Sequence, residues 1–227
     1  MSIYPSQYPP KNPERIQLYT MPTPNGRKAS VALEVMGLAY EAHRIDIMAG
    51  DQHDEEYVRI NPNAKIPTII DPDGPDGEPI ALMESGAILL YLAEKSGRCL
   101  PRDARLRWEA IQWLMFQSAG VGPMFGQFGH FFKFARGKTT DAYGEDRYAK
   151  ETERLLEVLD RRLDGRDYLV GQELSVADIA TVPWIDALDF YRGKKRVNFD
   201  SYSRVQAWVE RCRKVPGFEI GYQVGSA

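Results

Sequence analysis

Short apolar strands and helical patterns alternate through the first third of the chain, and this order restricts the fold more than any other feature. Residues 16–20 (IQLYT) favour a strand, and residues 25–38 show helical spacing of apolar residues up to a stop signal at Gly37. Residues 40–47 (YEAHRIDI) alternate in polarity and predict a second strand. Because a strand–helix–strand unit of about thirty residues makes a right-handed crossover, the two strands are expected to be parallel.

A hairpin and two more helices complete this first unit. A polar stretch is expected to hold a short helix around residues 55–59. Residues 66–71 (IPTIID) and 79–83 (PIALM) predict a hairpin, because the loop between them is rich in glycine and proline. Residues 84–97 predict an apolar helix that ends at a glycine. The order β-α-β-α-β-β-α describes a compact α/β domain over residues 16–97.

The sequence changes character after a predicted linker at residues 98–103. Only helical periodicities follow, and we expect an all-α domain over residues 104–227. Ser175 and Asp178 form an S-x-x-D capping signal at the start of one of these helices. Residues 1–15 have four prolines among their first thirteen positions and predict an extended arm. The predicted helical segments are 104–120, 146–165, 175–191 and 202–214.

Composition and charge exclude several classes of function. The net charge is −3 with acidic and basic residues interspersed, so neither nucleic acid nor an anionic membrane surface is an expected partner. No apolar run of about 18 residues could span a bilayer, and the N-terminal residues lack the apolar core of a signal peptide. We therefore expect a cytoplasmic protein.

Cysteine and histidine are sparse in the chain. Cys99 and Cys212 lie far apart, which allows a disulfide but favours two reduced thiols in a cytosolic protein. His43, His53 and His130 have no close spacing with one another or with a cysteine. No metal site is therefore expected.

The turn LYTMPTPNGRK (residues 18–28) stands where many redox proteins place a cysteine, between the first strand and the first helix. Thr23 and Asn25 occupy it instead, with Pro24 between them. One interpretation is structural: Pro24 makes the turn and Asn25 caps the helix. The other is that this helix start, with its hydrogen-bond donors, stabilises an anion that a ligand brings.

Two further stretches have both a structural and a ligand-binding interpretation. Pro67 is either an ordinary edge-strand proline or a cis proline that turns the backbone of Ile66 toward an extended peptide ligand. Glu84 and Ser85 lie where a predicted strand gives way to a helix. Ser85 can be the N-cap of that helix, and the same helix start suits a ligand carboxylate.

These motifs together resemble the glutathione transferase superfamily over residues 16–220. The resemblance rests on the element order and on KIPTII, ESGAILLYLAE and LSVADIATVPW. PTPNG, DQ, NPNAKIP and GPMFGQ are most similar to the bacterial Nu class and to its yeast prion-related homologues. The resemblance implies a thioredoxin-like first domain and an all-α second domain, which is the cytosolic glutathione transferase fold. It also implies glutathione as co-substrate and a homodimer.

The resemblance gives six of the candidate residues a role in binding glutathione, and it gives Pro67 the role of orienting the main chain of Ile66. Pro67 is expected to be cis, with Ile66 binding glutathione through its main chain. Glu84 and Ser85 are expected to hold the γ-glutamyl end.

The remaining binding residues each have a plain alternative. Gln52 and Lys65 are expected near the glycyl end of glutathione, although each could simply be a solvated polar residue. Arg147 is expected to reach glutathione from the helical domain, and the alternative is an ion pair on a helix surface.

The thiol of a glutathione bound in this way would fall at the start of the first helix, beside Thr23 and Asn25. These two are the predicted catalytic residues, acting as hydrogen-bond donors that favour the thiolate and not as bases. Because the substrate brings the sulfur, the protein needs no cysteine there.

The Nu-class resemblance implies that glutathione reduces a small disulfide, with reduced or oxidised glutathione as the bound ligand. The alternative is attack of glutathione on an electrophilic substrate, including ether cleavage and peroxide reduction. In that case the aromatic residues of segment 120–138 would line the second pocket, although such a run equally suits a core. A glutathione-binding module without turnover is the third interpretation.

Overall fold

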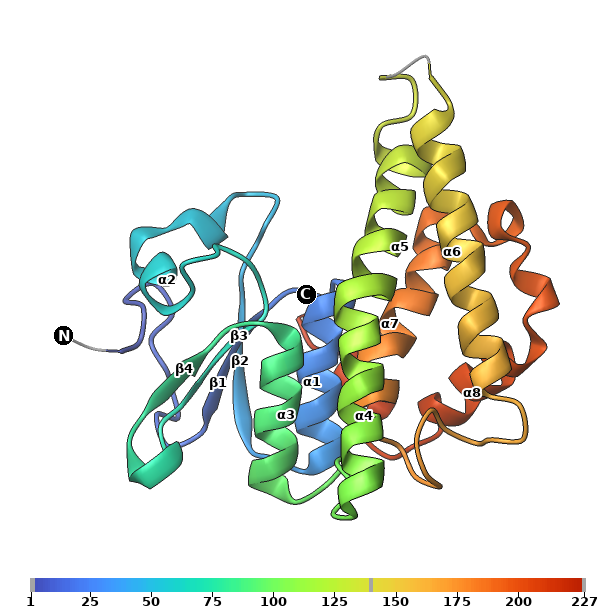
Figure 1. Cartoon of the computed structure of the whole chain (residues 1–227). Coiled ribbons are helices and arrows are strands. Elements are labelled where there is room, and N and C mark those ends of the chain that lie inside the picture. Colours follow the sequence, from blue (N-terminus) through green and yellow to red (C-terminus); the bar gives the residue numbers. More distant parts are fainter. Residues whose placement is uncertain (1–2, 139–140, 226–227) are drawn as a thin grey trace. The chain divides into compact units, whose positions relative to one another are not determined.

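The computed structural model describes residues 3–138 and 141–225 (Figure 1). Compactness divides the chain into two units: one runs up to Arg98 and takes in the chain from Pro216 onward, and the other is Cys99–Val215. The first unit is α/β and the second is helical, which confirms the predicted fold class. None of the helices in the described ranges combines the length and the apolar character needed to cross a membrane.

A four-stranded sheet forms the centre of the α/β unit. β1 (Ile16–Thr20), β2 (Tyr40–Arg44), β3 (Thr68–Asp71) and β4 (Ile80–Leu82) lie in the order β2-β1-β3-β4. β1 and β2 are parallel, as the crossover predicts. β3 runs antiparallel to both β1 and β4, so the predicted hairpin is confirmed.

β2, β3 and β4 are all shorter than the sequence pattern predicts, and local contacts explain the first two cases. β2 ends at Arg44 because the chain turns soon afterwards, where the Asp46 carboxylate accepts a hydrogen bond from the Met48 amide (2.9 Å). β3 begins at Thr68 because Pro67, which precedes it, has no N–H to donate to a ladder.

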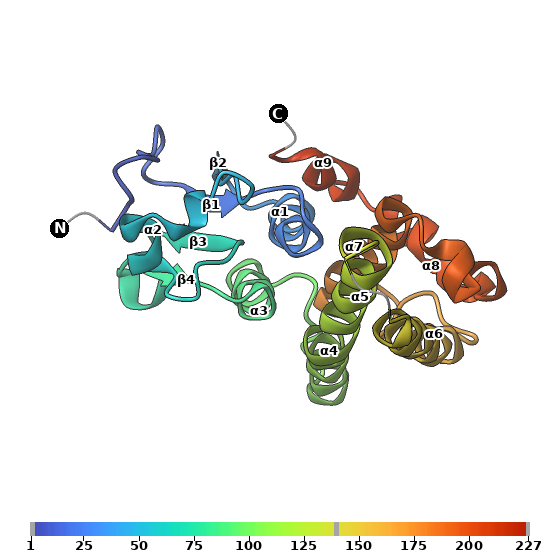
Figure 2. The same cartoon turned by 90° about the horizontal axis from the view of Figure 1, so that it is seen from above.

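Helices cover both faces of this sheet. α1 (Pro24–Met36) and α3 (Ser85–Ser96) lie side by side on one face, and α2 (Glu55–Ile60) lies on the other (Figures 1 and 2). The last helix, α9 (Phe218–Gln223), packs along α1 on the side away from α3 (Figure 2). α9 and α1 approach so closely at Gly221 that a Cβ there would lie 2.5 Å from the Cα of Val31.

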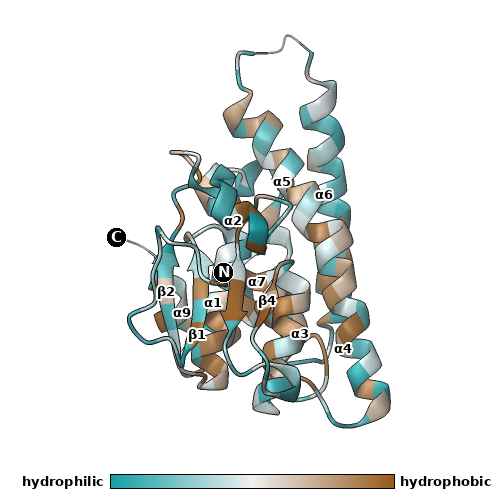
Figure 3. Cartoon of the chain, turned by 90° about the vertical axis from the view of Figure 1, so that its left-hand side faces the viewer, coloured by the Kyte–Doolittle hydropathy of each residue, from teal (hydrophilic) through white to brown (hydrophobic). Residues whose placement is uncertain are grey.

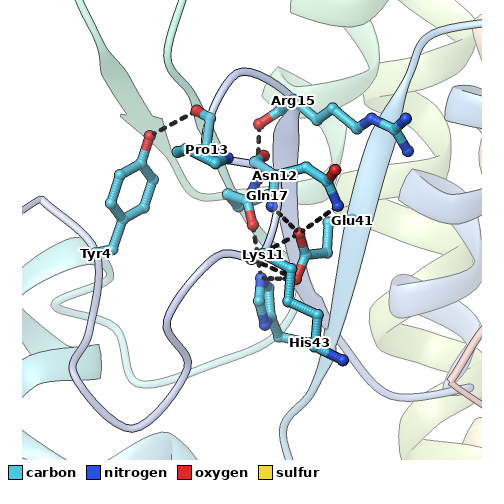
Figure 4. Close-up of polar contacts among 8 residues, drawn as sticks. All are labelled: Tyr4, Lys11, Asn12, Pro13, Arg15, Gln17, Glu41 and His43. Carbon is cyan, nitrogen blue, oxygen red and sulfur yellow. Dashed lines mark hydrogen bonds and ion pairs between the residues drawn. The ribbon is translucent and has the colours of Figure 1, made fainter.

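The N-terminal arm packs on the sheet face opposite α1 and α3. Glu41 of β2 fastens it by accepting hydrogen bonds from the amides of Lys11 (3.0 Å) and Asn12 (2.8 Å) (Figure 4). The Gln17 side chain donates to the Asn12 carbonyl (2.9 Å). The arm contributes Ile3, Tyr4 and Tyr8 to an apolar cluster whose buried members are Tyr19, Ile45, Tyr57 and Ile70.

The helical unit is a bundle of five main helices among the described residues. α4 (Ala104–Phe116) passes into α5 (Gly122–Gly129) through a π-helical segment, Gln117–Val121, and a second such segment, His130–Phe134, follows α5. The helix predicted over 104–120 therefore continues further than expected. Figure 3 shows polar and apolar residues alternating along α6 (Tyr143–Arg162), as expected of a helix with one face on a core. The helices are α4 (Ala104–Phe116), α5 (Gly122–Gly129), α6 (Tyr143–Arg162), α7 (Val176–Tyr191) and α8 (Ser203–Arg213).

A buried carboxylate organises the start of α7. Asp178 accepts hydrogen bonds from the Ser175 amide (2.8 Å), the Ser175 hydroxyl (2.7 Å) and the Leu169 amide (2.9 Å). The Trp208 indole of α8 also donates to it (2.8 Å). Burial raises the pKa of Asp178, while these donors act in the opposite direction. The predicted Ser175–Asp178 capping box is confirmed, and it also joins α7 to α8.

Replacement of this carboxylate should destabilise the protein strongly. Asp178→Ala would leave buried donors on Ser175, Leu169 and Trp208 without their acceptor, so we expect the free energy of unfolding to fall by about 3 kcal/mol or more. Urea unfolding followed by circular dichroism measures it. Glu210→Ala, on the exposed face of α8, should change stability by less than about 0.5 kcal/mol. Equal unfolding midpoints for the two variants would contradict this role.

Candidate functional site

The candidate thiol site lies at the start of α1. Thr23 has extended backbone angles (φ −89°, ψ 165°) and its hydroxyl oxygen accepts a hydrogen bond from the Gly26 amide (3.1 Å). Thr23 is therefore the N-cap, and the structural interpretation that made Asn25 the cap is wrong, because Pro24 already occupies the first helical turn. Asn25 lies half-buried in that turn. The Thr23 hydroxyl can still donate its own hydrogen.

Gly26 allows α1 to begin directly against the end of β1. A Cβ at this position would lie 2.0 Å from the Met21 carbonyl oxygen and 2.5 Å from the Thr20 hydroxyl oxygen. Both distances are far inside van der Waals contact, so any side chain would move the helix. The turn between β1 and α1 thus requires glycine for close approach.

The first turns of α1 are positively charged. No acidic residue lies in the first turn, although acidic residues are favoured at helix N-termini. The Arg27 guanidinium lies 4.4 Å from the centre of the Tyr222 ring of α9. Lys28 is only 2% exposed, and its Nζ lies 3.2 Å from the Ser85 hydroxyl oxygen. Burial lowers the pKa of Lys28 to about 7, and the Glu84 carboxylate acts against that shift.

The peptide bond between Ile66 and Pro67 is cis, as the resemblance implies. The ladder between β1 and β3 ends at the pair Tyr19 and Thr68, so Ile66 lies outside it. Ile66 is half-buried, and the neighbouring Lys65 side chain is exposed. The main chain of Ile66 is therefore placed where an extended ligand could pair with it.

Asn61 and Tyr57 fix the segment that leads to Ile66, and neither was singled out from the sequence. The Tyr57 hydroxyl and the Asn61 amide both donate to the Lys65 carbonyl (2.7 Å each). Both also contact the Thr68 hydroxyl oxygen at 2.9 Å. The NPN stretch offers a signal for this role, since asparagine commonly bonds to nearby backbone groups.

Glu84 and Ser85 stand at the start of α3. Glu84 is the N-cap, has a positive φ (66°, with ψ 111°) and makes no capping hydrogen bond with its side chain. The structural interpretation that made Ser85 the cap is therefore wrong: Ser85 is the first helical residue. A non-glycine residue in this backbone region is strained, and such strain is concentrated at functional sites. The Ser85 hydroxyl lies instead toward Lys28.

Gln52 and Arg147 lie on different units. Gln52 is on the short helical turn Asp51–His53, where its Nε2 lies 3.1 Å from His53 Nε2. Its Oε1 is buried and has no hydrogen-bond partner within the described residues. Arg147 is exposed on α6 beside a surface hollow of about 680 Å³. The neighbouring Glu151 is held by two hydrogen bonds from Arg154 (2.7 and 2.8 Å).

Tyr19 and the cysteines do not take part in this arrangement. Tyr19 is fully buried and stacks on His43, with ring centres 4.8 Å apart, so it packs in the core. Burial raises its pKa, so its hydroxyl stays protonated. No disulfide joins Cys99 to Cys212, and both belong to the helical unit. Burial also raises the pKa of Cys212 well above its usual value.

Part of the aromatic run after α4 forms core. Phe125 and Phe128 are fully buried, and Phe128 stacks on Phe132 with ring centres 5.1 Å apart. Met124 differs, because it lines the hollow beside Arg147. In the part of the chain that the structure describes, no three histidine, cysteine or acidic side chains form a cluster that could hold a metal ion.

Comparison with known proteins identifies the family. The model of the glutathione S-transferase N-terminal domain matches residues 14–94, and that of the C-terminal domain matches residues 118–216. The chain therefore belongs to the glutathione S-transferase family.

Within that family the chain is similar to disulfide-bond oxidoreductases. It is 45% identical over 202 residues to disulfide-bond oxidoreductase YfcG of Escherichia coli, with 88% of this chain and 91% of that protein covered. It is 37% identical to disulfide-bond oxidoreductase YghU of the same organism, covering 91% of this chain and 73% of that protein.

One solved structure is similar over almost its whole length. A glutathione transferase from Pseudomonas putida, with one glutathione disulfide bound per subunit, has a TM-score of 0.93 and 47% identity. The match covers 96% of this chain and 95% of that one.

Relief of the backbone strain at Glu84 should make the protein more stable. Glu84→Gly removes the Cβ that disfavours a positive φ, so we expect the free energy of unfolding to rise by about 1 kcal/mol. Ala87→Gly, exposed within α3, should lower it by about the same amount. Urea unfolding distinguishes the two. A loss of stability in Glu84→Gly equal to that in Ala87→Gly would show that Glu84 is not strained.

Proposed function

We propose that the chain is a glutathione-dependent disulfide-bond oxidoreductase in which the reacting sulfur belongs to glutathione and not to the protein. The start of α1 supports this most. It has a Thr23 cap, no acidic residue in its first turn, and no cysteine in the preceding turn. Such a helix start stabilises an anion placed against it, and the thiolate is the reactive form of a thiol. The similarity to the two Escherichia coli oxidoreductases supports the same reaction.

Glutathione would lie across the starts of α1 and α3. Ile66 would pair with its cysteinyl residue through the main chain, as an added strand does. Ser85 and the start of α3 would bind the γ-glutamyl carboxylate, and the exposed Glu84 carboxylate would bind its ammonium group. The thiol would then fall between Thr23 and Asn25.

Gln52 and Lys65 would bind the glycyl end of the tripeptide. The buried Oε1 of Gln52 supports this, because a ligand N–H would supply the hydrogen bond that this atom lacks within the described residues. The exposed Lys65 ammonium suits the glycyl carboxylate. Arg147 would add a third contact from the helical domain. Its exposed position on α6 supports that role.

The energy needed to ionise the thiol is modest. A thiol with a pKa near 8.5 is only a few per cent ionised at pH 7, and each pKa unit corresponds to about 1.4 kcal/mol. A helix start supplies about 0.3 to 2 kcal/mol to a nearby anion. Hydrogen bonds from the Thr23 hydroxyl and the Asn25 amide add to this. A pKa one to two units lower, roughly, would leave about half of the glutathione as thiolate.

The reaction then follows as two exchanges at sulfur. The thiolate of one glutathione attacks a sulfur of the substrate disulfide, forming a mixed disulfide and releasing a substrate thiolate, which takes a proton from water. A second glutathione thiolate attacks the glutathione sulfur of the mixed disulfide. The second substrate thiolate leaves, and glutathione disulfide forms. The bound glutathione disulfide of the Pseudomonas putida protein has the composition of this product.

The quaternary state that fits this proposal is a homodimer, and the cellular location that fits it is the cytoplasm. Trp108 and Met115 are 70% and 46% exposed, and their spacing puts them on one face of α4. An exposed apolar face of this kind supports association with a second copy. A cytoplasmic location is consistent with a reaction that consumes reduced glutathione.

Loss of the Asn25 amide should impair catalysis, whereas loss of both cysteines should not. A charge-assisted hydrogen bond is worth about 1.5 to 3 kcal/mol, so Asn25→Ala should lower kcat/KM by about ten-fold or more. The assay is glutathione-dependent reduction of 2-hydroxyethyl disulfide. The double variant Cys99→Ser, Cys212→Ala should keep activity within about two-fold, at a temperature where circular dichroism shows it folded.

The same preparations decide between the candidate reactions. Rapid conjugation of 1-chloro-2,4-dinitrobenzene with slow disulfide reduction would identify a conjugating transferase instead. Glutathione binding without turnover of a disulfide, an aromatic halide or a peroxide would identify a binding module. Loss of disulfide reduction in a folded double-cysteine variant would mean that a protein thiol carries the reaction.

A further inference from the structure

A lysine lies in the interior of the α/β unit, where lysine is rarely found. Lys28 is 2% exposed, and it reaches from the second turn of α1 to the first residue of α3. Its Nζ lies 3.2 Å from the Ser85 hydroxyl oxygen. A buried amine destabilises a fold unless its charge is compensated, so a lysine at the meeting of two helix starts is a candidate for a function.

Glu84 acts on Lys28 as a counter-charge. α1 packs against α3, α9 and β1. β1 has no charged residue, and the other charges of α3 lie at its far end. On α9 the acidic residue is Glu219, which is exposed. On α1 itself, Arg27 lies over Tyr222 and Glu34 accepts a hydrogen bond from Tyr40 (2.6 Å).

We propose that Lys28 is a positioning residue of the γ-glutamyl subsite, which turns the Ser85 hydroxyl toward the ligand carboxylate and takes up a proton as that carboxylate binds. This inference rests on the proposed function, in which Glu84 and Ser85 hold the γ-glutamyl end of glutathione. The ligand class it concerns is any γ-glutamyl peptide with a free α-carboxylate.

The direction of one hydrogen bond links the proton to the ligand. A neutral Lys28 amine can accept the Ser85 hydroxyl hydrogen, which then points into the protein. A protonated amine has no lone pair and must donate, so the Ser85 hydrogen turns away and can meet a carboxylate. The negative ligand charge in turn favours the protonated amine. Ligand and proton therefore bind together.

The expected proton uptake depends on pH in a defined way. Burial lowers the pKa of Lys28 to about 7, so at pH 8 only about one amine in ten is protonated before the ligand binds. Binding should then take up roughly 0.5 to 0.9 proton per site. At pH 6 the amine is already charged, and uptake should be about 0.1 proton or less.

Isothermal titration calorimetry with S-methylglutathione measures this uptake. This probe is chosen because it has no thiol whose ionisation would add to the proton balance. The observed enthalpy is compared in buffers of different ionisation enthalpy, at pH 8 and at pH 6. Lys28→Met has a similar length without the charge; it should lose the uptake at pH 8 and bind about ten-fold more weakly or worse. Lys65→Met, which removes an exposed lysine, should weaken binding but keep the uptake.

The outcomes separate this inference from the function on which it rests. Binding without uptake at pH 8 in the unaltered protein would overturn the inference alone, and this result does not depend on any variant folding. Equal uptake in Lys28→Met would also overturn it, because another group would then take the proton. Failure of S-methylglutathione to bind the unaltered protein would overturn both the inference and the proposed function.

Discussion

The first turn of α1 lies directly against the last residues of β1, since residue 26 has no side chain to keep them apart. This contact sets where the helix begins, and with it where Thr23 caps the helix and where the positive end of the helix dipole points. It also carries Lys28 inward to the first residue of α3. The geometry of the candidate site follows from how closely one helix approaches one strand.

The two helix starts of the site share a feature that a stable fold does not require. Neither α1 nor α3 has an acidic residue in its first turn, and Glu84 holds a strained backbone without capping α3. Most helices gain stability at this end from acidic residues and from capping side chains. The starts of α1 and α3 therefore have a positive electrostatic potential, which would stabilise a bound anion. Stability and binding therefore compete at the same residues.

Sequence reasoning succeeded where structure depends on residues close together in the chain. The strands, their parallel pair and the Asp178 capping box are of this kind. Asn25 is the stronger capping type of the two, but Pro24 occupies the first helical turn and Thr23 is therefore the cap. The burial of Lys28 was not predicted, because lysine normally lies at surfaces. The packing of α9 was not predicted either, since six residues are too few for a periodic pattern. The candidate ligand contacts came from family resemblance, and all of them, Arg147 included, stay predictions.

The packing of α9 on α1 makes the α/β unit discontinuous in the chain. Gly221 lies against Val31, and the Ser30 hydroxyl donates to the Gly221 carbonyl (2.7 Å). During synthesis, the strands and α1 leave the ribosome more than a hundred residues before the helix that covers α1. One side of α1 therefore stays uncovered until the chain has been made as far as α9. The helix that bears the candidate thiol site is thus made long before it is enclosed.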